Sequence, residues 1–210
     1  MKKVEKGSPK TGKVVGGGPV RYTVQPGQNA LLNVQVDFAL AAVPGAYYYA
    51  DCLALRYDRE LAVVTLSFAR TDALSGRVGD RLDVVMPAGA LFLFWNSSRD
   101  VEKTLDEQLK ALGVSPESRP IGVKTLARTT LFANVIFVST GGGESCLDFY
   151  YMPVRDIHLA KKNRSTIGLE PILRVLSSPV LLKNLFELSR PYAASIGPPQ
   201  TPNYGRVNVS

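Results

Sequence analysis

The chain has 210 residues, enough for one large domain or two small ones. Hydrophobic residues make up 45% of it and charged residues 20%, which excludes an entirely disordered chain, and no apolar run approaches the roughly 18 residues of a membrane-spanning helix. A formal net charge of +7 makes a nucleic acid one candidate partner.

Residues 1–21 are predicted to form a flexible basic tail, because glycines and prolines interrupt every regular pattern in them. No apolar segment follows the first lysines, so a secretory signal is not expected. With only two cysteines, we expect a cytoplasmic protein without a disulfide framework. The tail carries six basic residues and one acidic residue, so it supplies +5 of the net charge. Its basic residues, Lys2, Lys3, Lys6, Lys10, Lys13 and Arg21, are candidate nucleic-acid contacts.

Residues 22–114 are predicted to form the first of two strand-rich units. Hydrophobic and polar residues alternate over residues 32–40, which is typical of a half-buried strand. Three more hydrophobic or aromatic runs, separated by short turns, predict further strands. These runs cover residues 47–57, 61–69 and 81–86.

A helix is predicted at the end of this first unit, with Gly113 just past its last turn. Apolar side chains recur there at helical spacing and would form one buried face, made of Val101, Leu105, Leu109 and Leu112. Residues 91–95, which follow Pro87, fit two alternatives equally well. They could form the first buried turns of a helix, or a strand that pairs back across residues 87–89.

A loop rich in proline and serine, residues 113–120, separates the first unit from a second one. The second unit is predicted at residues 119–190, and its hydrophobic runs again predict four strands. These strands cover residues 123–128, 131–139, 145–151 and 172–176.

The second unit is predicted to end in a helix. Ser178 followed by Pro179 is a typical helix start, and the helix is predicted over residues 180–189, so that it ends before Pro191. Residues 191–210 are rich in proline and glycine and are predicted to form a C-terminal tail.

The two units resemble each other in sequence as well as in the order of their elements. Three short motifs recur in the same order, and their spacing changes only where loops can absorb insertions. Similarity between any two strands could explain each match alone, but the shared order favours a duplication. The paired motifs are residues 49–51 with 132–134, 66–68 with 147–149, and 82–85 with 173–176. The predicted fold is α+β, with two repeats of an antiparallel sheet of about four strands followed by a helix, packed as one pseudo-symmetric body.

The second unit also resembles a small, functionally uncharacterised prokaryotic domain family. The resemblance rests on an aromatic-Ala-Asn motif at residues 132–134, a Leu-Asp-Phe motif at 147–149 and an Arg-Val-x-x-Ser-Pro helix start at 174–179. The match is weaker in the first unit, where Asp51 replaces the asparagine and Ser67 the aspartate. These motifs look structural, so the resemblance implies a fold in tandem duplication and no activity.

Four strands followed by a helix, present twice, are similar in architecture to the Whirly and Pur-type folds, which bind single-stranded nucleic acids. Residues 21–24, Arg-Tyr-Thr-Val, with Gly27 behind them, are faintly similar to the opening of a Whirly strand. This likeness concerns topology, and a fold alone does not establish a function.

Catalysis is not predicted, and we expect neither a metal nor a cofactor. The single histidine, His158, falls in a basic loop, where an exposed side chain is its ordinary role. Cys52 and Cys146 fall within strands, where a free cysteine usually packs as a small apolar residue. A pair of carboxylates could act in acid–base chemistry, but a turn cap or a bond to a neighbouring backbone donor explains them better. This structural role is predicted for Asp51, Asp148 and Asn134.

Single-stranded nucleic acid is the favoured ligand, because it needs basic residues near aromatic rings that could stack on bases, and the chain offers both, as in Arg56–Tyr57 and in the tyrosines at residues 47–49. The alternative is a homo-oligomeric structural or scaffold component whose apolar and aromatic strands form subunit interfaces. Both alternatives describe a non-catalytic binding or assembly protein. In the folded part of the chain, the predicted nucleic-acid contacts are Arg56, Tyr57, Lys161, Lys162 and Arg164.

Overall fold

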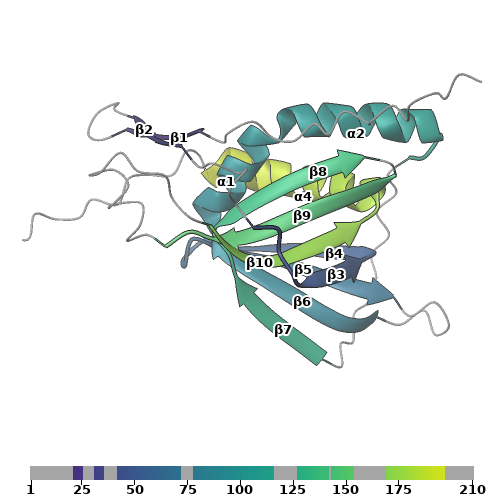
Figure 1. The fold of residues 1–210 in the computed structure, drawn as a ribbon, viewed down its shortest axis with the longest axis horizontal. Helices are drawn as coiled ribbons and strands as arrows, with labels where there is room; N and C mark the ends of the chain where they lie inside the picture. Colours follow the sequence, from purple (N-terminus) through teal and green to yellow (C-terminus); the bar gives the residue numbers. More distant parts are fainter. Residues whose placement is uncertain are drawn as a thin grey trace, which may run out of the picture.

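The computed structural model describes residues 21–25, 31–35, 42–71, 78–115, 127–141, 143–153 and 169–196. Within these ranges the chain has an α+β fold with two four-stranded sheets, a two-stranded hairpin and three helices (Figure 1). The hairpin pairs β1 (Arg21–Gln25) with β2 (Leu31–Gln35) in antiparallel register. The strand predicted at residues 32–40 is thus described only over its first residues.

Sheet I has the strand order β4-β5-β6-β7. Three consecutive strands, β4 (Cys52–Asp58), β5 (Val63–Thr71) and β6 (Val78–Pro87), are antiparallel. The fourth strand, β7 (Ala127–Phe132), comes from the second half of the chain and runs parallel to β6. The sheet of the first half is therefore completed by a strand from the second.

Sheet II has the strand order β3-β10-β9-β8 and mirrors this arrangement. The strands β8 (Val135–Gly141), β9 (Glu144–Tyr151) and β10 (Glu170–Ser177) are antiparallel. The fourth strand, β3 (Tyr47–Ala50), comes from the first half and runs parallel to β10. The prediction that each half builds its own antiparallel sheet was wrong on this point, because β3 and β7 each join the sheet of the other half.

The chain changes sheets at two sharp corners. At Asp51 the predicted strand 47–57 breaks into β3 and β4, and at Ala133–Asn134 the chain passes from β7 into β8. The backbone N–H of Asp51 donates to the carbonyl of Ala69 at 3.1 Å, and that of Asn134 donates to the carbonyl of Tyr150 at 3.0 Å. Strands that bend from one sheet into another commonly form the corners of such two-sheet packings.

The inner faces of the two sheets meet in one hydrophobic core. Phe68 of β5 and Phe149 of β9 are fully buried and touch edge to face, with ring centroids 5.8 Å apart. Strand alternation explains this burial, since residues 64, 66 and 68 of β5 share the face that points inward.

Helix α1 (Ala88–Ser97) and helix α4 (Pro179–Ile196) complete the core. Phe94 of α1 stacks on Phe186 of α4 at a centroid distance of 5.4 Å. Residues 91–95 are helical, which decides between the two alternatives that the sequence left open. As predicted, Ser178 caps α4, because its hydroxyl oxygen accepts the N–H of Leu181 at 3.2 Å.

Helix α4 does not end before Pro191, as the sequence predicted, but continues to Ile196. A proline inside a helix costs about 3 kcal/mol, and tertiary packing supplies the compensation. Ala193 is fully buried, and the ring of Tyr192 meets that of Tyr57 edge to face at 5.9 Å. The first residues of the predicted C-terminal tail are therefore helical, and residues 197–210 lie outside the described part of the chain.

Helix α2 (Arg99–Leu112) packs against α4 through charged side chains. Lys183 on α4 is only 8% exposed, and its ammonium lies 3.1 Å from Glu102 and 2.8 Å from Asp106 of α2. As predicted, Gly113 ends α2 in a left-handed conformation, with φ of 65°. No helix among the described residues is long and apolar enough to cross a membrane.

Candidate functional site

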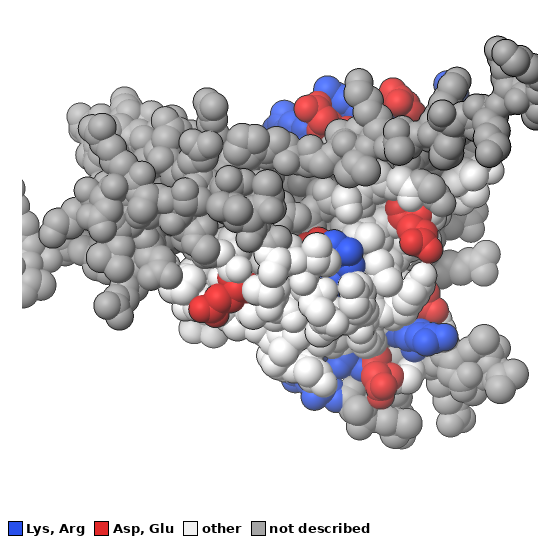
Figure 2. Space-filling view, viewed as in Figure 1, with Lys and Arg blue, Asp and Glu red and all other residues white. Residues whose placement is uncertain are grey.

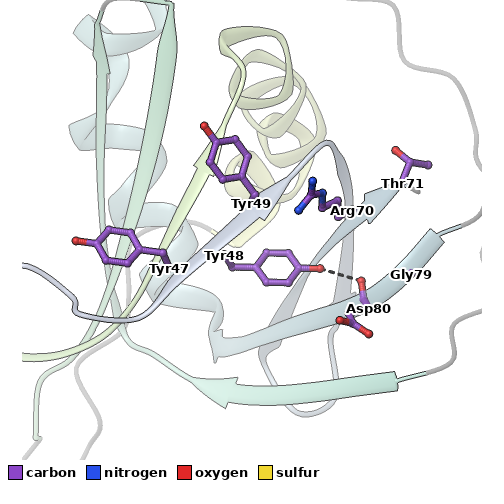
Figure 3. Close-up of a pocket in the computed structure, with 7 residues that line it drawn as sticks. All are labelled: Tyr47, Tyr48, Tyr49, Arg70, Thr71, Gly79 and Asp80. Atoms are coloured by element: carbon purple, nitrogen blue, oxygen red, sulfur yellow. Dashed lines mark hydrogen bonds between the residues drawn. The ribbon is translucent and has the colours of Figure 1, made fainter. Parts of the chain in front are cut away.

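Three consecutive tyrosines line a pocket at the edge of sheet II, where β3 has β10 on only one side (Figure 3). The pocket has a volume of about 510 Å³. Its other walls come from the end of β5 and the start of β6 in sheet I. The residues of this tyrosine pocket are Tyr47, Tyr48, Tyr49, Arg70, Thr71, Gly79 and Asp80.

Strand alternation gives the three tyrosines different roles. Tyr47 and Tyr49 point to the outer face of sheet II and are 59% and 55% exposed. Tyr48 points the other way, is half-buried against the core, and donates its hydroxyl to the carbonyl of Asp80 at 2.8 Å. Burial, together with the nearby charges of Asp80 and Asp51, raises the pKa of Tyr48 above its usual value. Tyr48 is therefore a protonated anchor, whereas Tyr47 and Tyr49 are available to a ligand.

Two opposite charges complete the tyrosine pocket. Arg70 is exposed at the end of β5, and Asp80 is exposed near the start of β6. Among the residues that the structure describes, neither side chain forms an ion pair. Within the described part of the chain, both charges can thus meet polar groups of a molecule in the pocket.

The outer face of sheet I carries an arginine cluster. The carboxylate of Asp83 is fully buried, and it receives the Nε atoms of Arg81 and Arg128, each at 2.7 Å. Arg81 also donates to the hydroxyl of Ser67 at 3.0 Å. Burial raises the pKa of Asp83, but hydrogen bonds from Arg81 and Ser67 and the two positive charges outweigh it, so the pKa is lowered overall. The arginines are committed to Asp83, which makes this cluster a structural feature.

The outer face of sheet II is mostly uncharged in the view of Figure 2. Its ion pair joins Arg174 of β10 to Asp148 of β9 through two bonds of 2.6 Å. This pairing raises the pKa of Arg174. Asp148 thus bonds the side chain of a neighbouring strand. The prediction that it caps a turn or accepts a bond from a backbone donor was wrong.

The corner residues Asp51 and Asn134 have the structural role that the sequence predicted. Asp51 accepts the N–H of Thr71 at 2.8 Å and also its hydroxyl. Burial raises the pKa of Asp51, but these bonds from Thr71 outweigh it and lower the pKa. Asn134 accepts the N–H of Met152 and donates to its carbonyl, both at 2.7 Å. Each side chain thus continues the hydrogen bonding of a strand past a corner.

The predicted contacts Arg56 and Tyr57 lie on opposite faces of β4. Arg56 is exposed on the outer face of sheet I, while Tyr57 is half-buried and packs on Tyr192. The two side chains therefore cannot contact one ligand side by side. Arg21 begins β1, where the structure describes the backbone alone. The remaining predicted contacts, Lys2, Lys3, Lys6, Lys10, Lys13, Lys161, Lys162 and Arg164, lie outside the described residues.

Sequence reasoning did not identify Arg70 or Asp80. Both reach the tyrosine pocket only because β3 crosses to sheet II, and hydrophobic alternation does not specify which strands become neighbours. Both cysteines are half-buried, and burial raises the pKa of each thiol, which fits their expected role as small apolar residues. Comparison with family models, curated proteins and solved structures finds no match to this chain.

Proposed function

We propose that this chain is a non-catalytic binding protein whose ligand is single-stranded nucleic acid. The observation that carries the proposal is the tyrosine pocket, which two exposed tyrosines line together with an arginine that has no carboxylate partner among the described residues. Its volume of about 510 Å³ is in the range of ligand pockets. The similarity of the predicted architecture to the Whirly and Pur-type folds supports the same ligand class.

The physical requirements of this ligand fit the division of charge in the chain. Bases stack on aromatic rings at a gain of about 1–3 kcal/mol each, whatever their sequence. Phosphates bind to cationic side chains. Residues 1–21, with a net charge of +5, can supply these in addition to Arg70 of the pocket. The pocket would hold the bases, and the basic tail would supply most of the salt-dependent attraction.

Replacing Tyr49 by alanine is expected to weaken oligonucleotide binding about 5- to 150-fold, since one stacking interaction is lost. The measurement is fluorescence anisotropy of a labelled single-stranded oligonucleotide, titrated at several salt concentrations. Tyr49→Phe should keep most of the affinity, because the ring is retained. Phe132→Ala, which removes an exposed ring from sheet I, is the control and should have little effect. Absence of binding at low salt would reject the ligand.

We also propose that the chain consists of two copies of one unit that exchange their first strands. Residues matched by the sequence motifs have equivalent surroundings, since Asp51 bonds Thr71 as Asn134 bonds Met152. Phe68 and Phe149 are matched residues and touch each other, as expected across a twofold axis. These contacts support the tandem duplication that the domain-family resemblance implies.

A homo-oligomer is the second candidate function, and the weakly charged outer face of sheet II favours it (Figure 2). Exposed aromatic side chains on such a face are typical of interfaces. If the chain forms a homo-oligomer, light scattering coupled to size exclusion should give the mass of a dimer or a larger assembly. Tyr47→Arg should lower this mass, because it places a charge in the interface. A monomeric mass at high protein concentration would count against this candidate.

A further inference from the structure

We infer that the arginine cluster on the outer face of sheet I, beyond its structural role, binds a phosphate of the single strand through Arg128. This inference rests on the proposed function, and it adds a second contact surface to the tyrosine pocket. The group recognised is a phosphodiester of the backbone, so the contact does not depend on the base sequence.

The arginine cluster carries more positive charge than it neutralises. The Oδ2 atom of Asp83 lies 3.2 Å from Nη2 of Arg81 and 2.7 Å from Nε of Arg128. The two guanidiniums therefore lie side by side, although like charges repel each other. Two positive charges and one carboxylate leave a net charge of +1. One further anion would therefore be favourable at this place.

Sheet II shows that an ion pair of this kind needs only one arginine. Arg174 and Asp148 form a one-to-one pair there through two bonds of 2.6 Å. In the alignment of the two units, Asp83 takes the place of Arg174. By the same alignment Arg128 matches Gly45, which has no side chain. Arg128 thus has no counterpart in sheet II, and its charge exceeds what the ion pair requires.

The guanidinium of Arg128 is the accessible part of the cluster. Its side chain is 55% exposed, against 31% for Arg81, which also bonds Ser67. Asp83 contacts the Nε atom of Arg128, and no described residue accepts a hydrogen bond from its two Nη atoms. A guanidinium with free Nη atoms can donate two hydrogen bonds to one phosphate. Because Asp83 already orients the side chain, less conformational entropy is lost on binding.

The position of Arg128 suits a long polymer. Arg128 lies on β7, the free edge of sheet I (Figure 1). Its cross-strand partner Arg81 directly follows Asp80 of the tyrosine pocket and points to the opposite face of β6. The two surfaces are therefore separated by the thickness of one sheet, which several nucleotides can span around the edge.

The test is the salt dependence of binding, measured by anisotropy with a labelled single strand of about 16 nucleotides. Each phosphate contact adds about 0.7 to the slope of log Kd against log salt concentration. Arg128→Ala should therefore lower the slope by about 0.7 and weaken binding about 5-fold at about 0.1 M salt. Arg128→Lys keeps the charge and should restore most of the slope. Lys110→Ala, which removes an exposed cation from α2, should leave the slope unchanged.

Thr130→Glu tests the same surface while every partner of Asp83 is kept. Thr130 is exposed on β7 and lies opposite Asp83 in the strand register, so the new carboxylate would lie beside Arg128 and compete with the phosphate. Binding should weaken about 5-fold at about 0.1 M salt, the effect of one lost phosphate contact. Ala111→Glu, which adds the same charge at an exposed position of α2, should have little effect.

The salt slope separates this contact from the tyrosine pocket, since Tyr49→Ala removes no charge and should weaken binding at an unchanged slope. An unchanged slope in Arg128→Ala, or an equal loss in Lys110→Ala, would overturn the phosphate contact while the proposed function stands. Unaltered binding by Thr130→Glu would overturn it as well. Absence of binding by the parent protein at low salt would overturn both proposals.

Polyglutamate, added as a competitor at the same concentration of negative charges, tests the class of partner. It should displace little of the strand, because it offers no bases to the tyrosine pocket. Displacement equal to that by the unlabelled strand, lost in Arg128→Ala, would assign the surface to an acidic protein segment and overturn the nucleic-acid contact.

Discussion

Replacing Phe149 by alanine is expected to lower the free energy of unfolding by about 3–5 kcal/mol. Phe149 is fully buried on β9 and touches Phe68 of β5, so the two rings join the inner faces of the two sheets. Truncation removes apolar contacts on both sides and leaves a cavity that close-packed neighbours fill only in part. The loss is a large fraction of the total stability of a typical domain.

Urea unfolding followed by the fluorescence of Trp95, the only tryptophan of the chain, measures this loss. Trp95 is half-buried on α1, which packs on the same core. Phe149→Leu keeps most of the volume and should cost about 1.5 kcal/mol or less. Leu61→Ala, at a side chain that is 72% exposed, should change stability by about 0.5 kcal/mol at most.

A double-mutant cycle isolates the contact between the two rings. Combining Phe68→Leu with Phe149→Leu should give a coupling free energy of about 0.5–1.5 kcal/mol, the range for an edge-to-face aromatic pair. A cost for Phe149→Ala below about 1 kcal/mol, or additive effects in the cycle, would mean that these rings do not join the two sheets.

The presence and type of most elements could be predicted from the sequence, because local patterns determine them. Alternating burial along β5 and the Ser178–Pro179 start of α4 are local features, and both agree with the structure. The extension of α4 past Pro191 could not be predicted, since it depends on the packing of Tyr192 against Tyr57, which is far away in the sequence. Long-range packing here outweighs a local preference.

The exchange of strands between the sheets could not be predicted for a similar reason. Alternation at residues 47–49 shows which side chains share a face, but it does not say whether β10 or β5 is the neighbour. The tyrosines were therefore recognised as possible binding residues, whereas Arg70 and Asp80 were not. Their place in the tyrosine pocket depends on the corner at Asp51, which turns the chain from sheet II into sheet I.

The corner at Asn134 should be a sensitive polar position, and Asn134→Asp is expected to cost about 2–4 kcal/mol at neutral pH. The side-chain amide donates to the carbonyl of Met152 at 2.7 Å, in a half-buried site. The substitution replaces this donor by a carboxylate oxygen, which repels the carbonyl and leaves it without its partner. Asp51→Asn is the matched control at the other corner. There the Thr71 hydroxyl can accept a hydrogen bond as well as donate one, so the loss should be about 1 kcal/mol.

The pH dependence of the Asn134→Asp variant tests the cause of its instability. Repulsion from the Met152 carbonyl should raise the pKa of the introduced carboxyl in the folded state above its unfolded value of about 3.9. A group of this kind favours the folded state when protonated, so the deficit relative to the parent protein should be smallest near pH 4 and below. It should grow as the pH rises from about 3.9 to the raised pKa, because the unfolded carboxyl is then ionised while the folded one still holds its proton, and it should level off above the raised pKa. Urea unfolding of both proteins at about pH 4 and pH 7 gives the two differences in free energy. A deficit that is equal at both pH values would contradict the repulsion, and would attribute the loss to the shape of the side chain instead of its charge.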